Sequence, residues 1–337
     1  MKNNAVLVIY TGGTIGMDRN PLTDKLEPVG IDKLRQYVPE LEKFPYFIDY
    51  QSTSQQIDSS DMTPKIWEEL ARIIEDRYAD YDGFVILHGT DTMSYTASAL
   101  SFMLENLNKT IVLTGSQLPI SNLRNDAHDN FITSLIIASE SKVPEVCIYF
   151  ENKLFRGNRT TKLNAENFDA FYSGNYAPLA ETGLYINYNK TKIAKPKSGE
   201  LKVHYNFDPN IAILKIFPGI TQEVMHNILN VKGLRGVILE TYGSGNAPTA
   251  AWFSKELRVA IKKKIIVFHI LQCKSGRTAP TTYHAGLRVG GMVNGHDITG
   301  EAAITKLMFL LGQDHGNKTI KKMLATSMRG EMSHVKK

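Results

Sequence analysis

Short apolar runs alternate with polar loops and helical patterns along the first half of the chain. The apolar runs predict buried strands at Val6–Tyr10, Phe44–Tyr50, Phe84–Leu87, Ile111–Leu113 and Val146–Phe150. Apolar residues at helical spacing predict helices that begin at Pro64 and that cover Met93–Leu107 and Asp126–Ser139. This alternation indicates a parallel sheet with right-handed crossover helices. The segment 18–28, with two prolines and several polar residues, is predicted to be a loop.

The pattern changes after Tyr188. Residues 189–202, NKTKIAKPKSGELK, hold five lysines, a proline and a glycine, which is typical of an interdomain linker. A second alternation of strands and helices begins at Ile211. The sequence therefore predicts an α/β protein with two α/β domains. A larger N-terminal domain with a mostly parallel sheet covers 1–188, a linker covers 189–210, and a smaller C-terminal domain covers 211–337.

The composition is that of an ordinary globular protein, with 42% hydrophobic and 22% charged residues among 337. The net charge of +5 is spread along the chain, so it gives little support to a nucleic-acid partner. No apolar run approaches about 18 residues, which argues against a membrane span, and the first run is too short for a signal peptide. We expect a cytoplasmic protein with Cys147 and Cys273 as buried free thiols.

Two strand ends carry the same small pattern. The first apolar run leads into TGGT, which ends at Thr14, and the run at 84–87 leads into HGTD, which contains Thr90 and Asp91. Ligands of open α/β sheets bind beyond the carboxyl ends of strands, so both threonines are candidates for a site. A threonine hydroxyl needs a base or a nearby charge to become a nucleophile, and Asp91 is placed to accept a proton or hold a lysine. The alternative for Asp91 is a cap of the following helix.

Two further polar segments are candidates for the same site. Lys162 ends the segment RGNRTTK, and an ammonium beside a hydroxyl lowers its pKa or, when desolvated, acts as a base. The residues alone favour a solvated basic loop for this segment. The segment DSSD at 58–61 fits a helix N-terminus, but its carboxylates and hydroxyls also suit the charged groups of an amino acid. His88 and His269, at strand ends, are interpreted as structural groups.

The glycines at positions 12, 13 and 16 form an incomplete dinucleotide fingerprint, and the lysine of a phosphate-binding loop is missing. A non-catalytic module that binds a nucleotide or an amino acid through these glycine loops stays open as the alternative to an enzyme.

Five segments together resemble the bacterial L-asparaginases, and the match is closest to the cytoplasmic type I enzymes. They are TGGTIG (11–16), DSSDM (58–62), HGTDTMSYTASALSFMLENL (88–107), TGSQLP (114–119) and RGNRTTK (156–162). The resemblance covers nearly the whole chain, including YGSGNAP (242–248) and GEAAITKL (300–307). It implies hydrolysis of L-asparagine to L-aspartate and ammonia without a metal or another cofactor, in a homodimer that often forms a dimer of dimers.

The resemblance also implies roles for the polar strand ends. Thr14 matches the family's first catalytic threonine and candidate nucleophile, and Thr90, Asp91 and Lys162 match the second threonine with its aspartate and lysine. Thr14 is then expected to attack the side-chain amide carbon, with backbone N–H groups of the glycine loops stabilising the oxyanion. Direct attack by water, with Thr14 only polarising the amide, is the alternative.

Other positions match residues that surround the substrate in the family. The positions that hold the α-amino and α-carboxylate groups are matched by Asp58, Ser59 and Ser60. Ser116 and Asn246 match positions near the pocket.

One departure concerns a tyrosine of the loop after the first motif, which many relatives place against the nucleophilic threonine. This chain has no tyrosine between Tyr10 and Tyr37, and Leu26 falls roughly at the expected position. Tyr283 matches a tyrosine of the C-terminal half that would approach the site instead.

Two more expectations follow from the resemblance. Some type I enzymes are cooperative, and Thr161 and Cys273 fall where an effector site near the dimer interface would lie. A related amidotransferase subunit that acts on tRNA-bound amino acids carries an added N-terminal domain, which we do not expect here because the first motif begins at residue 11.

Overall fold

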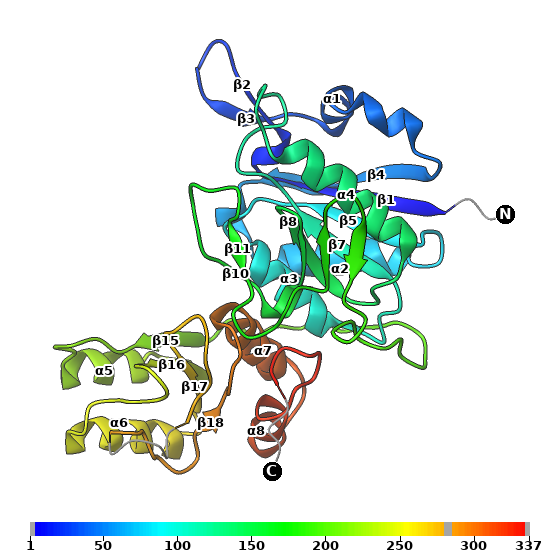
Figure 1. Ribbon diagram of the computed structural model, residues 1–337. Coiled ribbons are helices and arrows are strands. Elements are labelled where there is room, and N and C mark those ends of the chain that lie inside the picture. Colours follow the sequence, from blue (N-terminus) through cyan, green and yellow to red (C-terminus); the bar gives the residue numbers. More distant parts are fainter. Residues whose placement is uncertain (1–3, 280–284, 334–337) are drawn as a thin grey trace. The chain divides into compact units, whose positions relative to one another are not determined.

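An eight-stranded sheet organises the first half of the chain (Figure 1). The computed structural model describes residues 4–279 and 285–333 and divides into two units, 1–205 and 206–337. The sheet of the first unit has the order β13-β12-β9-β8-β7-β5-β1-β4. Its strands are β1 (Ala5–Gly12), β4 (Phe47–Ile57), β5 (Gly83–Leu87), β7 (Thr110–Thr114), β8 (Val146–Phe150), β9 (Lys153–Arg156), β12 (Ala180–Thr182) and β13 (Ile186–Tyr188). The strands from β8 to β4 pair in parallel, and the other three are antiparallel, so the mostly parallel sheet is confirmed.

The order of the parallel strands indicates where a ligand site would lie. Along the chain, β1 is followed by β4 on one side of it and then by β5, β7 and β8 on the other side. The connections therefore run in opposite directions from β1, and in open α/β sheets the ligand crevice lies at such a point, here beyond the carboxyl ends of β1 and β5. The two strand ends lie level, since Tyr10 pairs with Leu87 in the ladder.

Helices cover both faces of this sheet (Figure 1). They are α1 (Ile31–Gln36), α2 (Pro64–Asp76), α3 (Met93–Met103) and α4 (Ala127–Glu140). Side chains alternate between the two faces of a strand, and Val6, Val8 and Tyr10 of β1 pack in one buried cluster with α1 and α4. The alternate residues Leu7 and Ile9 are buried on the opposite face, on the side of α2 and α3.

The segment after the first glycine motif is a hairpin rather than the expected loop. Its strands are β2 (Met17–Arg19) and β3 (Leu26–Pro28). Side-chain pairs within the hairpin stabilise it, because Arg19 contacts Asp24 at 2.7 Å and Asn20 donates to Glu27 at 2.7 Å. The sequence prediction missed the hairpin because these polar residues pair with one another across the turn in the folded chain.

Two other element boundaries differ from the predictions. The predicted helix 93–107 ends at Met103, and the next two residues form β6 (Leu104–Glu105), which pairs with β14 (Lys202–Val203). The lysine-rich segment after β13 is thus attached to the first unit. The predicted strand at 44–50 begins at Phe47 and continues to Ile57, where it reaches the crevice.

The second unit contains a smaller parallel sheet in the order β15-β16-β17-β18. Its elements are β15 (Ile211–Lys215), α5 (Gln222–Leu229), β16 (Gly236–Thr241), α6 (Ala251–Lys262), β17 (Ile266–Leu271), β18 (Val293–Asn294), α7 (Gly300–Gly312) and α8 (Asn317–Leu324). Thr221 caps α5, because its side chain accepts the N–H of Val224. The smaller C-terminal α/β unit is therefore confirmed.

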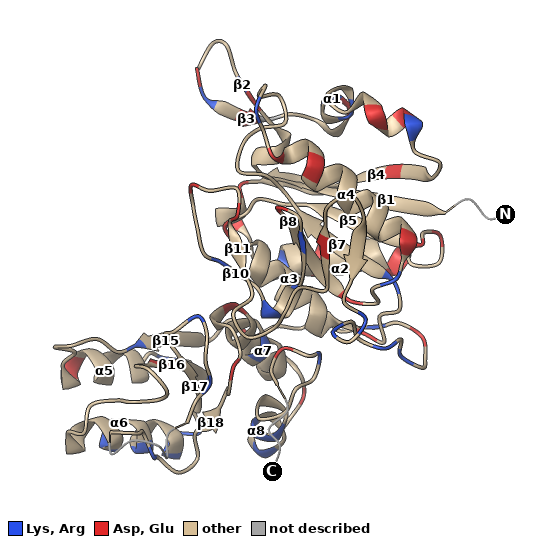
Figure 2. Cartoon of the chain, in the orientation of Figure 1, with Lys and Arg blue, Asp and Glu red and all other residues tan. Residues whose placement is uncertain are grey.

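The two cysteines differ in exposure. Cys147 is buried in β8, as predicted, but Cys273 is exposed, so the prediction of two buried thiols is wrong for that residue. Cys273 lies beyond the end of β17, where the chain has left the sheet. Acidic and basic residues are interspersed on the elements of both units (Figure 2). Within the described ranges, no helix is both long and apolar enough to cross a bilayer.

Candidate active site at the ends of β1 and β5

Three glycines let the loops beyond β1, β4 and β5 touch through their backbones. A Cβ on Gly12 would lie 2.3 Å from the carbonyl oxygen of Ile57, and one on Gly13 would lie 2.4 Å from the amide nitrogen of Gly89. A Cβ on Gly89 would in turn lie 2.6 Å from Oγ of Ser59. Gly12 and Gly13 also have φ values of +112° and +86°, which side-chain-bearing residues rarely adopt. No larger residue fits at these positions without moving a loop of the crevice.

The loop beyond β7 joins this contact through a fourth glycine. A Cβ on Gly115 would lie 2.2 Å from the carbonyl oxygen of His88. Four of the predicted motifs, TGGT, DSSD, HGTD and TGSQ, are therefore brought together at one edge of the sheet. Sequence spacing alone did not require this contact, since the loops come from four different strands.

Thr14 begins a 3₁₀ turn, Thr14–Gly16, that is fixed from several sides. The Gly16 carbonyl accepts the hydroxyl of Tyr10 at 3.0 Å and the N–H of Val29 at 2.7 Å, and the Ile15 carbonyl accepts an N–H from Ile120. Burial raises the pKa of Tyr10 to about 12, so this phenol is a neutral donor that holds the turn. Thr14 itself is half-buried.

Lys162 forms a hydrogen-bonded group with Thr90 and Asp91. These two residues lie in the loop beyond β5, next to the turn that begins at Thr14. Lys162 Nζ donates to Thr90 Oγ1 at 2.7 Å and to Asp91 Oδ1 at 2.7 Å. The Lys162 side chain is 16% exposed and Thr90 is 7% exposed, whereas the Asp91 carboxylate is 66% exposed. The ammonium thus bridges a buried hydroxyl and a solvated carboxylate. Asp91 does not act as the helix cap, because α3 begins after Thr92.

Lys162 reaches this position because its segment is anchored in the interior. It lies in β10 (Thr161–Lys162), which pairs with β11 (Phe171–Tyr172). Upstream, Arg156 and Glu145 form an ion pair in which each side chain is only 8% exposed. The interpretation of this segment as a solvated basic loop is wrong, because the buried carboxylate of Glu145 compensates the guanidinium.

The DSSD segment lies at the same edge of the sheet, with Ser59 against Gly89. Ser59 is buried, and its carbonyl accepts the hydroxyl of Thr92 at 2.7 Å. The exposed Asp58 carboxylate accepts both the N–H and the hydroxyl of Ser60 at 2.8 Å. These two bonds lower the pKa of Asp58, so it is a carboxylate at neutral pH.

The TGSQ loop shows a residue that sequence reasoning missed. Ser116 is buried, and its hydroxyl donates to the carbonyl of Leu118 at 2.5 Å, within its own loop. The next residue, Gln117, instead extends its side chain to Thr90, whose hydroxyl donates to Gln117 Oε1 at 3.4 Å. The sequence offers one signal for Gln117, because it lies in the TGSQ motif. Within that motif, only Ser116 is predicted to lie near the pocket.

His88 is structural, as interpreted from the sequence. It is fully buried, its Nδ1–H donates to the Gly89 carbonyl at 2.6 Å, and its Nε2 accepts the hydroxyl of Thr96 at 2.9 Å. Thr96 in turn accepts the indole N–H of Trp67 at 3.0 Å. Burial lowers the pKa of His88 to about 4, so a neutral imidazole links α2 and α3 to the peptide before Thr90.

Four further predicted residues belong to other segments of the chain. Thr161 is buried and pairs with Tyr172 in the ladder that carries Lys162. Asn246 and Cys273 belong to the second unit, where Asn246 bridges to Gly286. Tyr283 lies outside the described residues.

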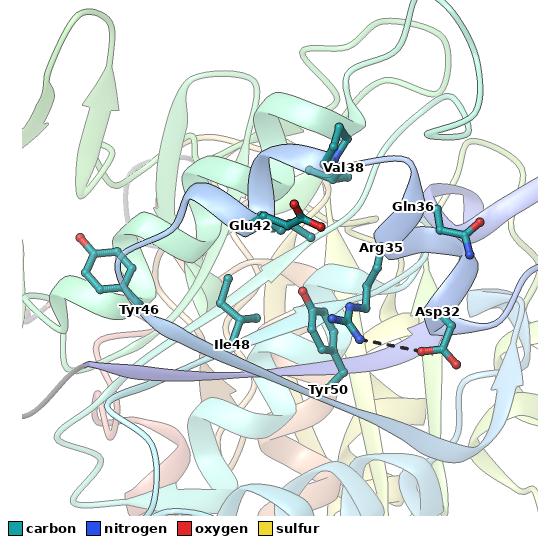
Figure 3. A pocket seen from close by; sticks show the side chains of 10 residues that line it. Asp32, Arg35, Gln36, Val38, Glu42, Tyr46, Ile48 and Tyr50 are labelled. Carbon is teal, nitrogen blue, oxygen red and sulfur yellow. Dashed lines mark ion pairs between the residues drawn. The ribbon is translucent and has the colours of Figure 1, made fainter.

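A separate cavity of about 440 Å³ lies between α1 and β4 (Figure 3). Tyr50 and Arg35 line it, with the guanidinium 4.8 Å from the ring centroid. None of the predicted site residues contributes to its walls. Across residues 4–279 and 285–333, no group of three or more His, Cys, Asp or Glu side chains is arranged to hold a metal ion.

Comparisons with known proteins match both halves of the chain. The model of the asparaginase N-terminal domain matches residues 5–194, and that of the glutaminase/asparaginase C-terminal domain matches residues 210–324. The chain belongs to the asparaginase family. Over 339 residues and 99% of both chains, this asparaginase-family protein is 44% identical to L-asparaginase 1 of Escherichia coli K12.

Two further relatives extend the comparison. The chain is 40% identical to the 60 kDa lysophospholipase of Mus musculus, of which it covers 62% while 97% of its own length is matched. The crystal structure of L-asparaginase I from Vibrio cholerae matches with a TM-score of 0.91 and 38% identity, covering 98% of this chain and all of that one. The expected family and its two-domain α/β fold are thus confirmed.

Because the glycine loops are in close contact, one added methyl group should strongly lower the free energy of unfolding. We expect Gly13→Ala to lower the free energy of unfolding by about 2–4 kcal/mol, because the methyl meets the Gly89 backbone and φ is positive. Gly183→Ala is the matched control, since a Cβ there meets nothing within 4 Å. Urea unfolding of both variants measures the difference. Equal stability of the two would contradict the tight contact of these loops.

The buried His88 predicts a pH dependence of stability. The folded state holds this imidazole neutral down to about pH 4, whereas the unfolded chain takes up a proton below about pH 6.5. The free energy of unfolding therefore falls as the pH drops from 6.5 to 4, by up to ~3 kcal/mol from this residue. His88→Gln should lose this part of the slope, and the exposed His315→Gln should keep it. Fluorescence of Trp67 in a Trp252→Phe background reports unfolding of the first unit.

Proposed function

We propose that this protein is an L-asparaginase that hydrolyses L-asparagine to L-aspartate and ammonia. The observation that carries the proposal is the group formed by Lys162, Thr90 and Asp91, beside the turn that begins at Thr14. Hydrolysis of an amide needs a nucleophile and a group that moves protons, and these residues supply both at one edge of the sheet. The names of the E. coli and Vibrio relatives support asparagine as the substrate.

In the proposed mechanism, Thr14 Oγ1 forms a bond to the side-chain amide carbon of the substrate. Its proton passes to the leaving nitrogen, which departs as ammonia and leaves an ester on Thr14. Water then attacks the ester carbon, one water proton returns to the Thr14 oxygen, and L-aspartate leaves. Backbone N–H groups of the glycine loops stabilise the oxyanion in both steps. Thr90 accepts a hydrogen bond from the attacking water and orients it, while the Lys162 ammonium, shared with Asp91, holds the Thr90 oxygen in place.

The charged groups of the substrate are assigned to the DSSD loop. The exposed carboxylate of Asp58 suits the α-ammonium, and the Ser59 and Ser60 segment suits the α-carboxylate. Ser116 and Asn246 are proposed to complete the pocket wall. Because Ser116 turns its hydroxyl into its own loop, its contribution is through the backbone.

The activation of Thr14 differs from that of relatives with a loop tyrosine. Leu26 of β3 is 44% exposed and has no hydroxyl to offer. We propose that Tyr283 supplies this hydroxyl, from the C-terminal half of the chain.

The proposed setting of the enzyme follows the resemblance to type I enzymes. We propose a cytoplasmic homodimer that forms a dimer of dimers, with Thr161 and Cys273 at an effector site. A sigmoidal dependence of rate on asparagine concentration supports the effector site, and a hyperbolic one over a wide range contradicts it.

Removal of either Thr14 or Lys162 should abolish most of the activity. We expect Thr14→Ala and Lys162→Met each to lower kcat for ammonia release by at least about 10³-fold, because each removes a group that acts in the transition state. The exposed Thr191→Ala is the control and should keep full activity. Mass spectrometry after rapid quenching with a slow substrate should find an acyl adduct on Thr14.

Adduct mapping, ammonia release and an assay on a lysophospholipid together distinguish the alternative functions. An adduct on Thr90 alone contradicts the assignment of the nucleophile. Ligand binding without ammonia release from L-asparagine favours the non-catalytic binding module. Release of fatty acid from lysophosphatidylcholine, without ammonia release from asparagine, would instead support the activity for which the mouse relative is named.

Removal of the negative charge of Asp58 should weaken the binding of L-asparagine. We expect Asp58→Asn to raise KM for L-asparagine by about 10–100-fold with a smaller change in kcat, because a charge-assisted bond to the α-ammonium is lost. Asp61→Asn, an exposed neighbour in the same segment, is the matched control. Steady-state kinetics of both variants measures the effect, and equal KM values would refute the assignment.

A further inference from the structure

The side chain of Gln117 joins two loops of the candidate active site. Its Oε1 accepts the hydroxyl of Thr90 at 3.4 Å, and its Nε2 donates to the backbone carbonyl of Asn167 at 3.0 Å. Asn167 lies in the loop between β10 and β11, which follows Lys162 directly. Gln117 therefore connects the loop that bears Thr90 with the hairpin that bears Lys162.

The backbone of Gln117 is held by a buried carboxylate. Asp126 is 6% exposed, and it accepts the N–H of Gln117 at 2.9 Å and that of Leu118 at 3.2 Å. Asn130, one turn further along α4, donates to the carbonyl of Gly115 at 3.0 Å. The loop cannot shift freely, so the Gln117 side chain starts from a fixed point.

Donors and acceptors can be assigned in only one way for the hydrogen bonds that join Lys162, Thr90, Gln117 and the Asn167 carbonyl. The Asn167 carbonyl can only accept, so the amide nitrogen of Gln117 faces it and Oε1 faces Thr90. The Lys162 ammonium can only donate, so Thr90 Oγ1 accepts from it. The proton of the Thr90 hydroxyl is therefore directed to Gln117.

We propose that Gln117 is a positioning residue that fixes the direction of the Thr90 hydroxyl during asparagine hydrolysis. A hydroxyl oxygen has two lone pairs, and Lys162 occupies one of them. With its proton turned to Gln117, the oxygen keeps its second lone pair to accept a hydrogen bond from the attacking water, whose proton goes to the Thr14 oxygen. At 3.4 Å the bond is long for a hydroxyl donor, so it orients Thr90 without holding its proton tightly. This inference rests on the proposed function of the site.

Two substitutions at position 117 test the role. Gln117→Met has a similar length but no acceptor, and we expect kcat to fall about tenfold with KM within about twofold. Gln117→Glu keeps an acceptor near Thr90 and adds a negative charge beside the Lys162 ammonium. It should move the pH profile of kcat/KM to higher pH by about half a unit or more, because a nearby carboxylate favours the charged form of lysine.

Asn167→Asp is the matched control for charge. It adds one negative charge at an exposed neighbour but leaves the backbone carbonyl that Gln117 contacts. Its pH profile should stay within about 0.2 units of the unsubstituted enzyme, since solvent screens an exposed charge. Thermal unfolding of all variants checks folding, and Gln117→Leu, which also lacks an acceptor, replaces Gln117→Met if the latter is unstable.

The outcomes separate this inference from the proposed function. Reduced kcat in Gln117→Met together with a shifted profile in Gln117→Glu supports the positioning role. If the unsubstituted enzyme releases ammonia but both variants match it in kcat and pH profile, Gln117 only fills space and the inference is wrong. If the unsubstituted enzyme releases no ammonia, the proposed function fails, and the role of Gln117 fails with it.

Discussion

The site depends on backbone contact between loops that leave four different strands. Gly12, Gly13, Gly89 and Gly115 each lie where a Cβ would meet the backbone or buried side chain of a neighbouring loop at 2.2–2.6 Å. Only residues without a side chain allow this approach, and two of them also adopt positive φ. The hydroxyls carried by these loops are thereby held in one small region, before any substrate binds.

The strand order of the sheet determines where the glycine loops meet. Hydrogen bonds from buried polar groups then fix the position of each loop. Because the strand order reverses at β1, the crevice opens beyond β1 and β5. Tyr10 holds the turn of Thr14 from below, His88 connects the Thr90 loop to two helices, and Asp126 holds the TGSQ loop. Such preorganisation is what electrostatic stabilisation of a transition state requires.

Local patterns in the sequence were sufficient for the fold and for half of the site. Thr14 and Thr90 could be singled out because each follows an apolar strand and a glycine, which is a short-range signal. The burial of Arg156 could not be predicted, since its partner Glu145 compensates it only in the folded chain. Gln117 was missed for a similar reason, because its contacts to Thr90 and Asn167 come from distant segments.

In the proposed reaction, the loops that carry Thr14 and Thr90 act on one bound substrate. A crystal structure of the Lys162→Met variant with L-asparagine tests it directly. We expect the amide carbon about 3–3.5 Å from Thr14 Oγ1, as in a near-attack geometry, with the α-ammonium at Asp58. An asparagine bound against Thr90 with its amide out of reach of Thr14, or bound away from the DSSD loop, would contradict it.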